Sequence, residues 1–268
     1  LMSKAGVDES SIDSRDAGMT AAKAIKDKGL PKHPIAWSWA QAEAVICDFA
    51  QLLGAYGGTF TGDAGKLNFN NDAGQQTLQV MVDSLKSGIS HPGSPTFLED
   101  DVIKALQSGE VAFGLNWEST FRDLNDTKAS KVAGKMGVSA TPTGPSGKRP
   151  GVNGAMAYAI SAGSKNPDAA WKVIEFVTSR EVQDQLAKSS MPNWIASFSD
   201  PNVVKINPEV FAACKVAYAD SILRPQVVNY NKVSAILQVE IQNALLGSKT
   251  AKAALDDAVN QGNDALAG

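Results

Sequence analysis

Apolar residues recur at helical spacing along much of the chain. This pattern predicts helices over residues 71–86, 100–107, 211–220, 232–246 and 250–259. Another helix is expected to begin at Asn166-Pro167-Asp168, because a capping residue is followed there by a proline and an acidic residue, both of which favour the first turn of a helix. In that helix we predict that Ala170, Val173, Ile174 and Val177 form a buried stripe and that Trp171 is a core residue. Thr178 and Glu181 have capping-box spacing for a following helix.

Short alternating or apolar runs between these helices predict strands. Val111 to Leu115 alternates large and small residues and stops at Asn116-Trp117. Met136 to Ala140 and Gly154 to Ser161 are the other candidates. Helices interspersed with a few strands predict the α/β class.

Charge and composition exclude several classes. The chain has 268 residues with a formal net charge of −3, so a nucleic-acid surface is not expected. Its longest apolar runs are far too short to cross a membrane, and its first residues do not resemble a signal peptide. Cys47 and Cys214 both lie in apolar contexts and are expected to be buried thiols, although a disulfide is possible in an exported protein.

The sequence motifs that usually mark a cofactor, metal or catalytic site are absent from the chain. We expect no cofactor, because the chain carries no phosphate loop, dinucleotide fingerprint or nucleophile elbow. We expect no metal site, because the two histidines, His33 and His91, stand before prolines in turns without ligand-spaced partners. One enzymatic alternative stays open: Glu43 and Glu118 both lie beside tryptophans and could form the carboxylate pair of a carbohydrate-active enzyme.

Aromatic residues gather at the ends of predicted elements, next to amides and charges. The aromatic members are Trp37, Trp39, Trp117, Trp194 and Tyr230. Their polar neighbours are Gln41, Glu43, Asn116, Asn153, Asn193 and Arg224. Core packing would explain any one of these tryptophans, but flat aromatic faces with hydroxyl-binding groups are together typical of a sugar site.

Eight segments in a fixed order resemble a known family. They read AKAIKDKG, PIAWSWAQAEA, LLGAYGGTF with GKLNFNN, ALQSGEVAFGLNW, VNGAMAYAISAGSKNPDAAWKVIEFVTS, MPNW, ILRPQVVNY and ALLGSKTAKAALDDA. This order resembles the extracellular sugar-binding proteins of bacterial ABC importers, the solute-binding family that includes the maltose-binding protein.

The resemblance implies a two-lobed type II periplasmic-binding-protein fold in which roughly the first third is missing. Residues 1–153 and 212–268 would form a nearly complete C-terminal lobe, and residues 154–211 a returning part of the N-terminal lobe. The chain would cross between the lobes near Asn153-Gly154 and near Phe211.

The resemblance also implies the function and the site. The protein would bind a mono- or oligosaccharide without catalysis, deliver it to a membrane permease, and act as a monomer when full length. It would be periplasmic or a cell-surface lipoprotein. The implied ligand-binding residues are Trp37, Trp39, Gln41, Glu43, Asn116, Trp117, Asn153, Gly154, Arg224 and Tyr230, with Trp117 as the stacking residue.

Overall fold

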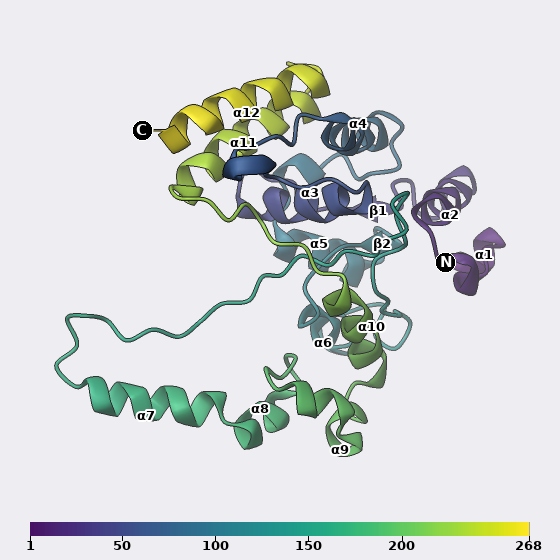
Figure 1. Cartoon of the computed structure of the whole chain (residues 1–268). Coiled ribbons are helices and arrows are strands. Elements are labelled where there is room, and N and C mark those ends of the chain that lie inside the picture. The colour runs from purple at the N-terminus through teal and green to yellow at the C-terminus, as the bar shows by residue number, and fades with distance from the viewer. Residues whose placement is uncertain (268) are drawn as a thin grey trace.

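Helices make up most of the molecule (Figure 1). The computed structural model describes residues 1–267, without the side chain of Ala64. Its α-helices are α1 Met2–Ala5, α2 Arg15–Asp27, α3 Glu43–Ala55, α4 Asp72–Lys86, α5 Glu99–Ser108, α6 Thr120–Leu124, α7 Pro167–Thr178, α8 Arg180–Leu186, α9 Pro201–Val204, α10 Pro208–Ala219, α11 Tyr230–Leu245 and α12 Ala251–Ala267. None of these helices is both long and apolar enough to cross a membrane.

A small parallel sheet lies beside the first helices. Strands β1 (Ile35–Ala36) and β2 (Phe113–Gly114) pair in parallel, with Ile35 opposite Phe113. The predicted strand over residues 111–115 is therefore present in its central part. Residues 136–140 and 154–161 lie outside any helix or strand, so those two strand predictions are wrong for this structure. A strand needs a neighbouring chain to satisfy its backbone groups, and these two segments have none among the described residues.

The main core lies between α3, α4, α11 and α12, which pack together in the upper part of Figure 1. Helix α3 is largely apolar and is buried along most of its length, including its polar residues Asp48 and Gln51. Leu237 and Ile241 of α11 and Leu255 of α12 are almost completely buried against it and its neighbours. The helices predicted at residues 71–86, 232–246 and 250–259 are all confirmed.

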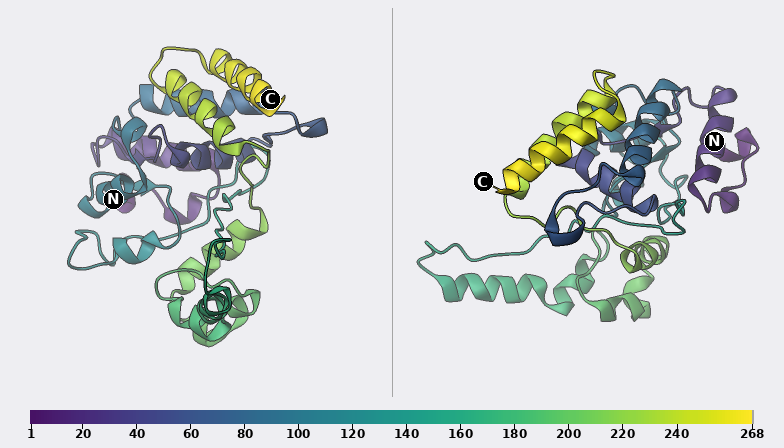
Figure 2. Two further views of the ribbon diagram at one scale, coloured as in Figure 1. Left: turned by 90° about the vertical axis from the view of Figure 1, so that its left-hand side faces the viewer. Right: turned by 45° about the horizontal axis from the view of Figure 1, so that its top comes forward.

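Helices α7 to α10 form a second group, which Figures 1 and 2 show apart from the main core. Its own small core contains Ala187, Val203 and Phe211. Helix α7 has no buried residue: Val173 is 61% exposed and Trp171 is 53% exposed. The predicted buried stripe and the predicted core role of Trp171 are therefore wrong in this structure, because no other described element covers that face.

The start of α8 also differs from its prediction. The helix begins at Arg180 after Ser179, and the Thr178 hydroxyl donates instead to the Ile174 carbonyl. No capping box forms at Thr178 and Glu181. A threonine hydroxyl in a helix often turns back to the preceding turn in this way.

Two chain segments, which lie side by side, connect the main core with the α7–α10 group. Val152 and Ile222 form a parallel bridge, in which the Asn153 amide donates to the Ile222 carbonyl at 2.9 Å. The Ile222 amide donates to the Gly151 carbonyl at 2.8 Å. These bonds place Asn153 close to the segment that leads to Arg224.

Candidate functional site: a polar and aromatic cluster at the start of α3

Glu43 is the first residue of α3, and three side chains from distant parts of the sequence converge on it. Arg224 Nη1 donates to Glu43 Oε1 at 2.6 Å, and the Tyr230 hydroxyl donates to the same oxygen. Ser234 Oγ donates to Glu43 Oε2 at 2.7 Å. Both carboxylate oxygens are therefore engaged, which ties α3 to α11 and to the segment before α11.

The charges and the aromatic ring of this cluster support one another. Arg224 also lies over the Tyr230 ring, 5.8 Å from its centroid. Partial burial works to lower the pKa of Arg224, but the hydrogen bond with Glu43 and nearby negative groups outweigh it and raise that pKa. Burial, followed by the hydrogen bond to Glu43, raises the pKa of Tyr230. At neutral pH the cluster therefore holds a guanidinium ion and an intact phenol.

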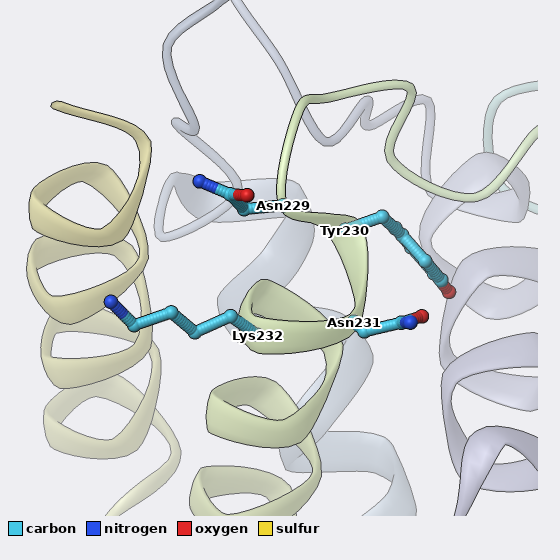
Figure 3. A pocket seen from close by; sticks show the side chains of 4 residues that line it. All are labelled: Asn229, Tyr230, Asn231 and Lys232. Atoms are coloured by element: carbon cyan, nitrogen blue, oxygen red, sulfur yellow. The ribbon is translucent and has the colours of Figure 1, made fainter. Parts of the chain in front are cut away.

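Tyr230 opens α11 and borders a shallow surface cavity of about 550 Å³ lined by Asn229, Tyr230, Asn231 and Lys232. Figure 3 shows the Tyr230 side chain pointing towards α3, whereas Lys232 extends to the other side, towards α12. Asn229 has a left-handed backbone with φ of 58°, a conformation that asparagine tolerates better than most residues. This turn directs Tyr230 back to Glu43.

Trp117 lies in a second cluster, with Asn116 and Gly154. Asn116 Nδ2 donates to the Glu99 carbonyl at 2.9 Å, and Trp117 Nε1 lies 3.4 Å from Glu99 Oε1. Gly154 packs against the indole so closely that a Cβ there would lie 2.6 Å from the Trp117 ring. Only glycine fits at this place without moving the tryptophan.

The crossing segments connect the two clusters. Gly154 contacts Trp117, its neighbour Asn153 bonds to Ile222, and Arg224 follows two residues later and bonds to Glu43. The structure therefore brings Glu43, Arg224 and Tyr230 into direct contact and links Trp117, Asn116 and Gly154 to them through this chain of contacts.

Trp37 and Trp39 stack on each other, with ring centroids 5.2 Å apart and an interplanar angle of 11°. Trp39 is 1% exposed and belongs to the main core. Trp37 is half-buried, and its indole nitrogen donates to Ser90 Oγ at 2.8 Å. Of the pair, Trp37 is the one that stays partly exposed, so Trp39 cannot make the direct ligand contact that the sequence predicts. Gln41 is exposed beside them.

Three residues of this region were missed in the sequence. Ser234 lies one helical turn after Tyr230, so its place beside Glu43 could have been found from i,i+4 spacing. Glu99 is the first residue of α5, and it also receives hydrogen bonds from Trp117 and Asn116, which no local sequence pattern indicates. Asp48, in the same helix as Glu43, is buried, and Ser38 Oγ donates to it at 3.4 Å. Burial raises the pKa of Asp48 well above its usual range, and the hydrogen bonds from Ser38 oppose that rise.

Glu118, the second carboxylate of the enzymatic alternative, has different neighbours from Glu43. Burial, and then the Glu118 charge, raises the pKa of Cys214 to about 11. Cys47 and Cys214 are both free and buried, as the sequence predicts. Among the described residues, no group of three or more metal-binding side chains could hold an ion.

Known proteins resemble this chain over most of its length. The family model for bacterial extracellular solute-binding proteins matches residues 1–184. A probable ABC transporter-binding protein of Deinococcus radiodurans is 29% identical over 210 residues, which cover 76% of this chain and 49% of that protein. A probable amino-acid ABC transporter periplasmic-binding protein of Sinorhizobium fredii is 24% identical, over 75% of this chain and 45% of that protein. This chain spans about half the length of these two relatives.

A solved structure shows the same fold. The maltose-bound MalE3 protein of T. maritima superposes with a TM-score of 0.85 at 27% identity, over 99% of this chain and 68% of that one.

Proposed function

This chain belongs to the bacterial extracellular solute-binding proteins and has the type II periplasmic-binding-protein fold, and we propose that it acts in the substrate-binding component of an ABC-type carbohydrate importer. One observation carries this proposal. The Glu43–Arg224–Tyr230 cluster lies next to the segment that packs on Trp117, so charged hydrogen-bonding groups and an aromatic face occur together. Sugars need both, because they present apolar C–H faces and a rim of hydroxyl groups.

The proposed ligand-binding residues differ in role. Trp117 would stack on the sugar, and Trp37 would offer a second ring face at the edge of the site. Arg224 and Tyr230 would bind hydroxyl groups, and Glu43, Asn116 and Asn153 would do so after giving up part of their present contacts. Gly154 would keep Trp117 in place, Gln41 would contact the ligand from the rim, and Trp39 would support Trp37 from the core.

The proposed mechanism is hinge closure. Residues 1–153 and the closing helices would form one lobe, and the returning segment from residue 154 part of the other. We place the second crossing near Ile222 rather than near Phe211, because Phe211 packs within the α7–α10 group. Ligand would shift the population towards the closed form, since it contacts both lobes only there.

The proposed partners and location follow from this role. The closed form would bind to a membrane permease. The protein would be a monomer, either free in the periplasm or anchored to the cell surface. The family description, extracellular solute-binding protein, supports a place outside the cytoplasm.

Two alternatives predict different results. One relative is named for amino-acid transport, so an amino acid is a second candidate ligand. The other alternative is a carbohydrate-active enzyme that uses Glu43 and Glu118 as its carboxylate pair. We favour binding over catalysis because both Glu43 oxygens are already held by donors, which leaves Glu43 poorly placed as a general acid.

A thermal-shift screen of the full-length protein tests the proposal. Neutral sugars, including maltose, D-glucose and D-mannitol, should be compared with the standard amino acids at equal concentration. Binding to the native state raises the unfolding temperature by mass action, so at least one sugar should raise it. A shift produced by amino acids alone would contradict the carbohydrate assignment.

A further inference from the structure

Arg224 is the cation that could recognise an acidic ligand in this site, and its charge is already paired. Its Nη1 lies 2.6 Å from Glu43 Oε1, and the two side chains are 29% and 40% exposed. Partial exposure weakens such a pair, but it does not remove the local neutralisation of charge. Tyr230 and Ser234 hold the Glu43 carboxylate in this position from two further directions.

The surroundings of the pair add negative rather than positive charge. Glu99 lies near enough to α3 for its charge to help raise the pKa values of Cys47 and Asp48, after burial as the main cause. Lys232 lines the cavity beside Tyr230 but extends towards α12 (Figure 3). A carboxylate entering the site would meet Glu99 and Glu43 while the guanidinium is engaged.

We infer that Glu43 is a specificity-determining residue that reserves this site for uncharged sugars and excludes sugar acids, by occupying the guanidinium of Arg224. This inference rests on the proposed carbohydrate-binding function. Arginine binds carboxylates strongly through paired N–H groups, so a free Arg224 would favour an acidic ligand. Without the Glu43 charge, the half-buried guanidinium would lack its anionic partner, and a ligand carboxylate could take that place. Specificity of this kind depends on a repulsive group as much as on an attractive one.

The test compares matched neutral and acidic ligands by calorimetry on the full-length protein. Suitable pairs are D-glucose with D-glucuronate, D-mannitol with D-mannonate, and maltose with maltobionate, because in each pair one carbon is oxidised to a carboxylate. Wild-type protein should bind the neutral member of a pair at least tenfold more tightly. Glu43→Gln, which keeps the side chain's size, should reduce that preference at least fivefold. Glu110→Gln also removes one glutamate charge, from an exposed side chain 3.1 Å from His91 and outside the cluster, so it should leave the preference unchanged.

Arg224→Gln gives a second test that does not depend on the Glu43 variant folding. It leaves the Glu43 charge without its partner, so the preference for the neutral member should rise at least fivefold. The inference is overturned if wild-type protein binds the acid as tightly as the neutral sugar, or if either cluster variant changes the preference by less than fivefold. Failure of every neutral sugar to bind wild-type protein would instead contradict the proposed function, and the inference would fall with it.

Discussion

At the scale of single residues, the site depends on side chains whose own hydrogen bonds hold them in place. Trp117 is held by Glu99 at its indole nitrogen and by Gly154 against its ring. Its sequence position, at the end of a short predicted strand, made it one of five aromatic candidates, and the resemblance to sugar-binding proteins named it as the stacking residue. The contacts that fix it come from residues 18 positions earlier and 37 positions later, and no local pattern shows them.

Trp117→Ala should weaken sugar binding by about 2 kcal/mol or more, as truncation of a central aromatic anchor commonly does. Calorimetry on the full-length variant would measure this loss, with circular dichroism to confirm folding. Trp39→Ala serves as a comparison, because Trp39 is a core residue and its loss should lower stability more than affinity. Normal affinity in Trp117→Ala, together with lost affinity in Trp37→Ala, would place the stacking residue in the segment before α3 instead.

Asp48→Asn should stabilise the protein, and more so at pH 8 than at pH 4.5. Burial raises the pKa of Asp48 above 3.8, so the native state binds this proton more tightly than the unfolded state. Stability linked to Asp48 is therefore present at low pH and is lost as pH rises through the native pKa. An asparagine keeps an acceptor for Ser38 without a charge. Urea unfolding of the wild type and the variant at both pH values would measure the change in the free energy of unfolding. An equal gain in stability at pH 8 and pH 4.5 would contradict the raised pKa of Asp48.

At the scale of elements, local spacing predicted the main helices, whereas of the three predicted strands only the one over residues 111–115 formed, and only in its central part. The helix bounds at residues 72–86 follow from local spacing and a cap, since Asn71 Oδ1 accepts from the Gly74 amide. Residues 154–161 alternate like a strand, but strand formation needs a partner that local sequence does not specify. The same limit explains α7. Its apolar stripe can be read from the sequence, but the sequence does not show whether another element packs against that stripe, and none of the described elements does.

Leu237→Ala in α11 should destabilise the full-length protein by about 2 to 5 kcal/mol, because it leaves a cavity in the main core. Val239→Ala in the same helix is the matched control, since Val239 is 42% exposed and its loss should change stability by about 0.5 kcal/mol or less. Chemical denaturation would compare the two. Equal destabilisation would show that α11 does not pack as described.

At the scale of the whole molecule, the site is assembled from segments that lie far apart in the chain. Glu43 is 181 residues from Arg224 and 187 from Tyr230. Their joint role was predicted only through the resemblance to sugar-binding proteins, because no spacing rule links such distant positions. Ser234 and Glu99, which the resemblance did not supply, were found only in the structure.

The full-length protein should not turn over the sugar that it binds. The Glu43 carboxylate is held by three donors, whereas the Glu118 charge acts, after burial, on the pKa values of Cys214 and Tyr218. Chromatography of a bound oligosaccharide after prolonged incubation should recover it intact. Release of shorter sugars that disappears in both Glu43→Gln and Glu118→Gln would establish the enzymatic alternative.

The central claim, that this site binds an uncharged sugar, is tested most directly by calorimetric titration of the full-length protein. The neutral sugar with the largest thermal shift should bind with one site per chain and a dissociation constant in the micromolar range or below. Glu43→Ala and Trp117→Ala should each weaken that binding at least tenfold while the fold is kept. Saturable binding that neither substitution changes would contradict the account, because the ligand would then bind elsewhere on the protein.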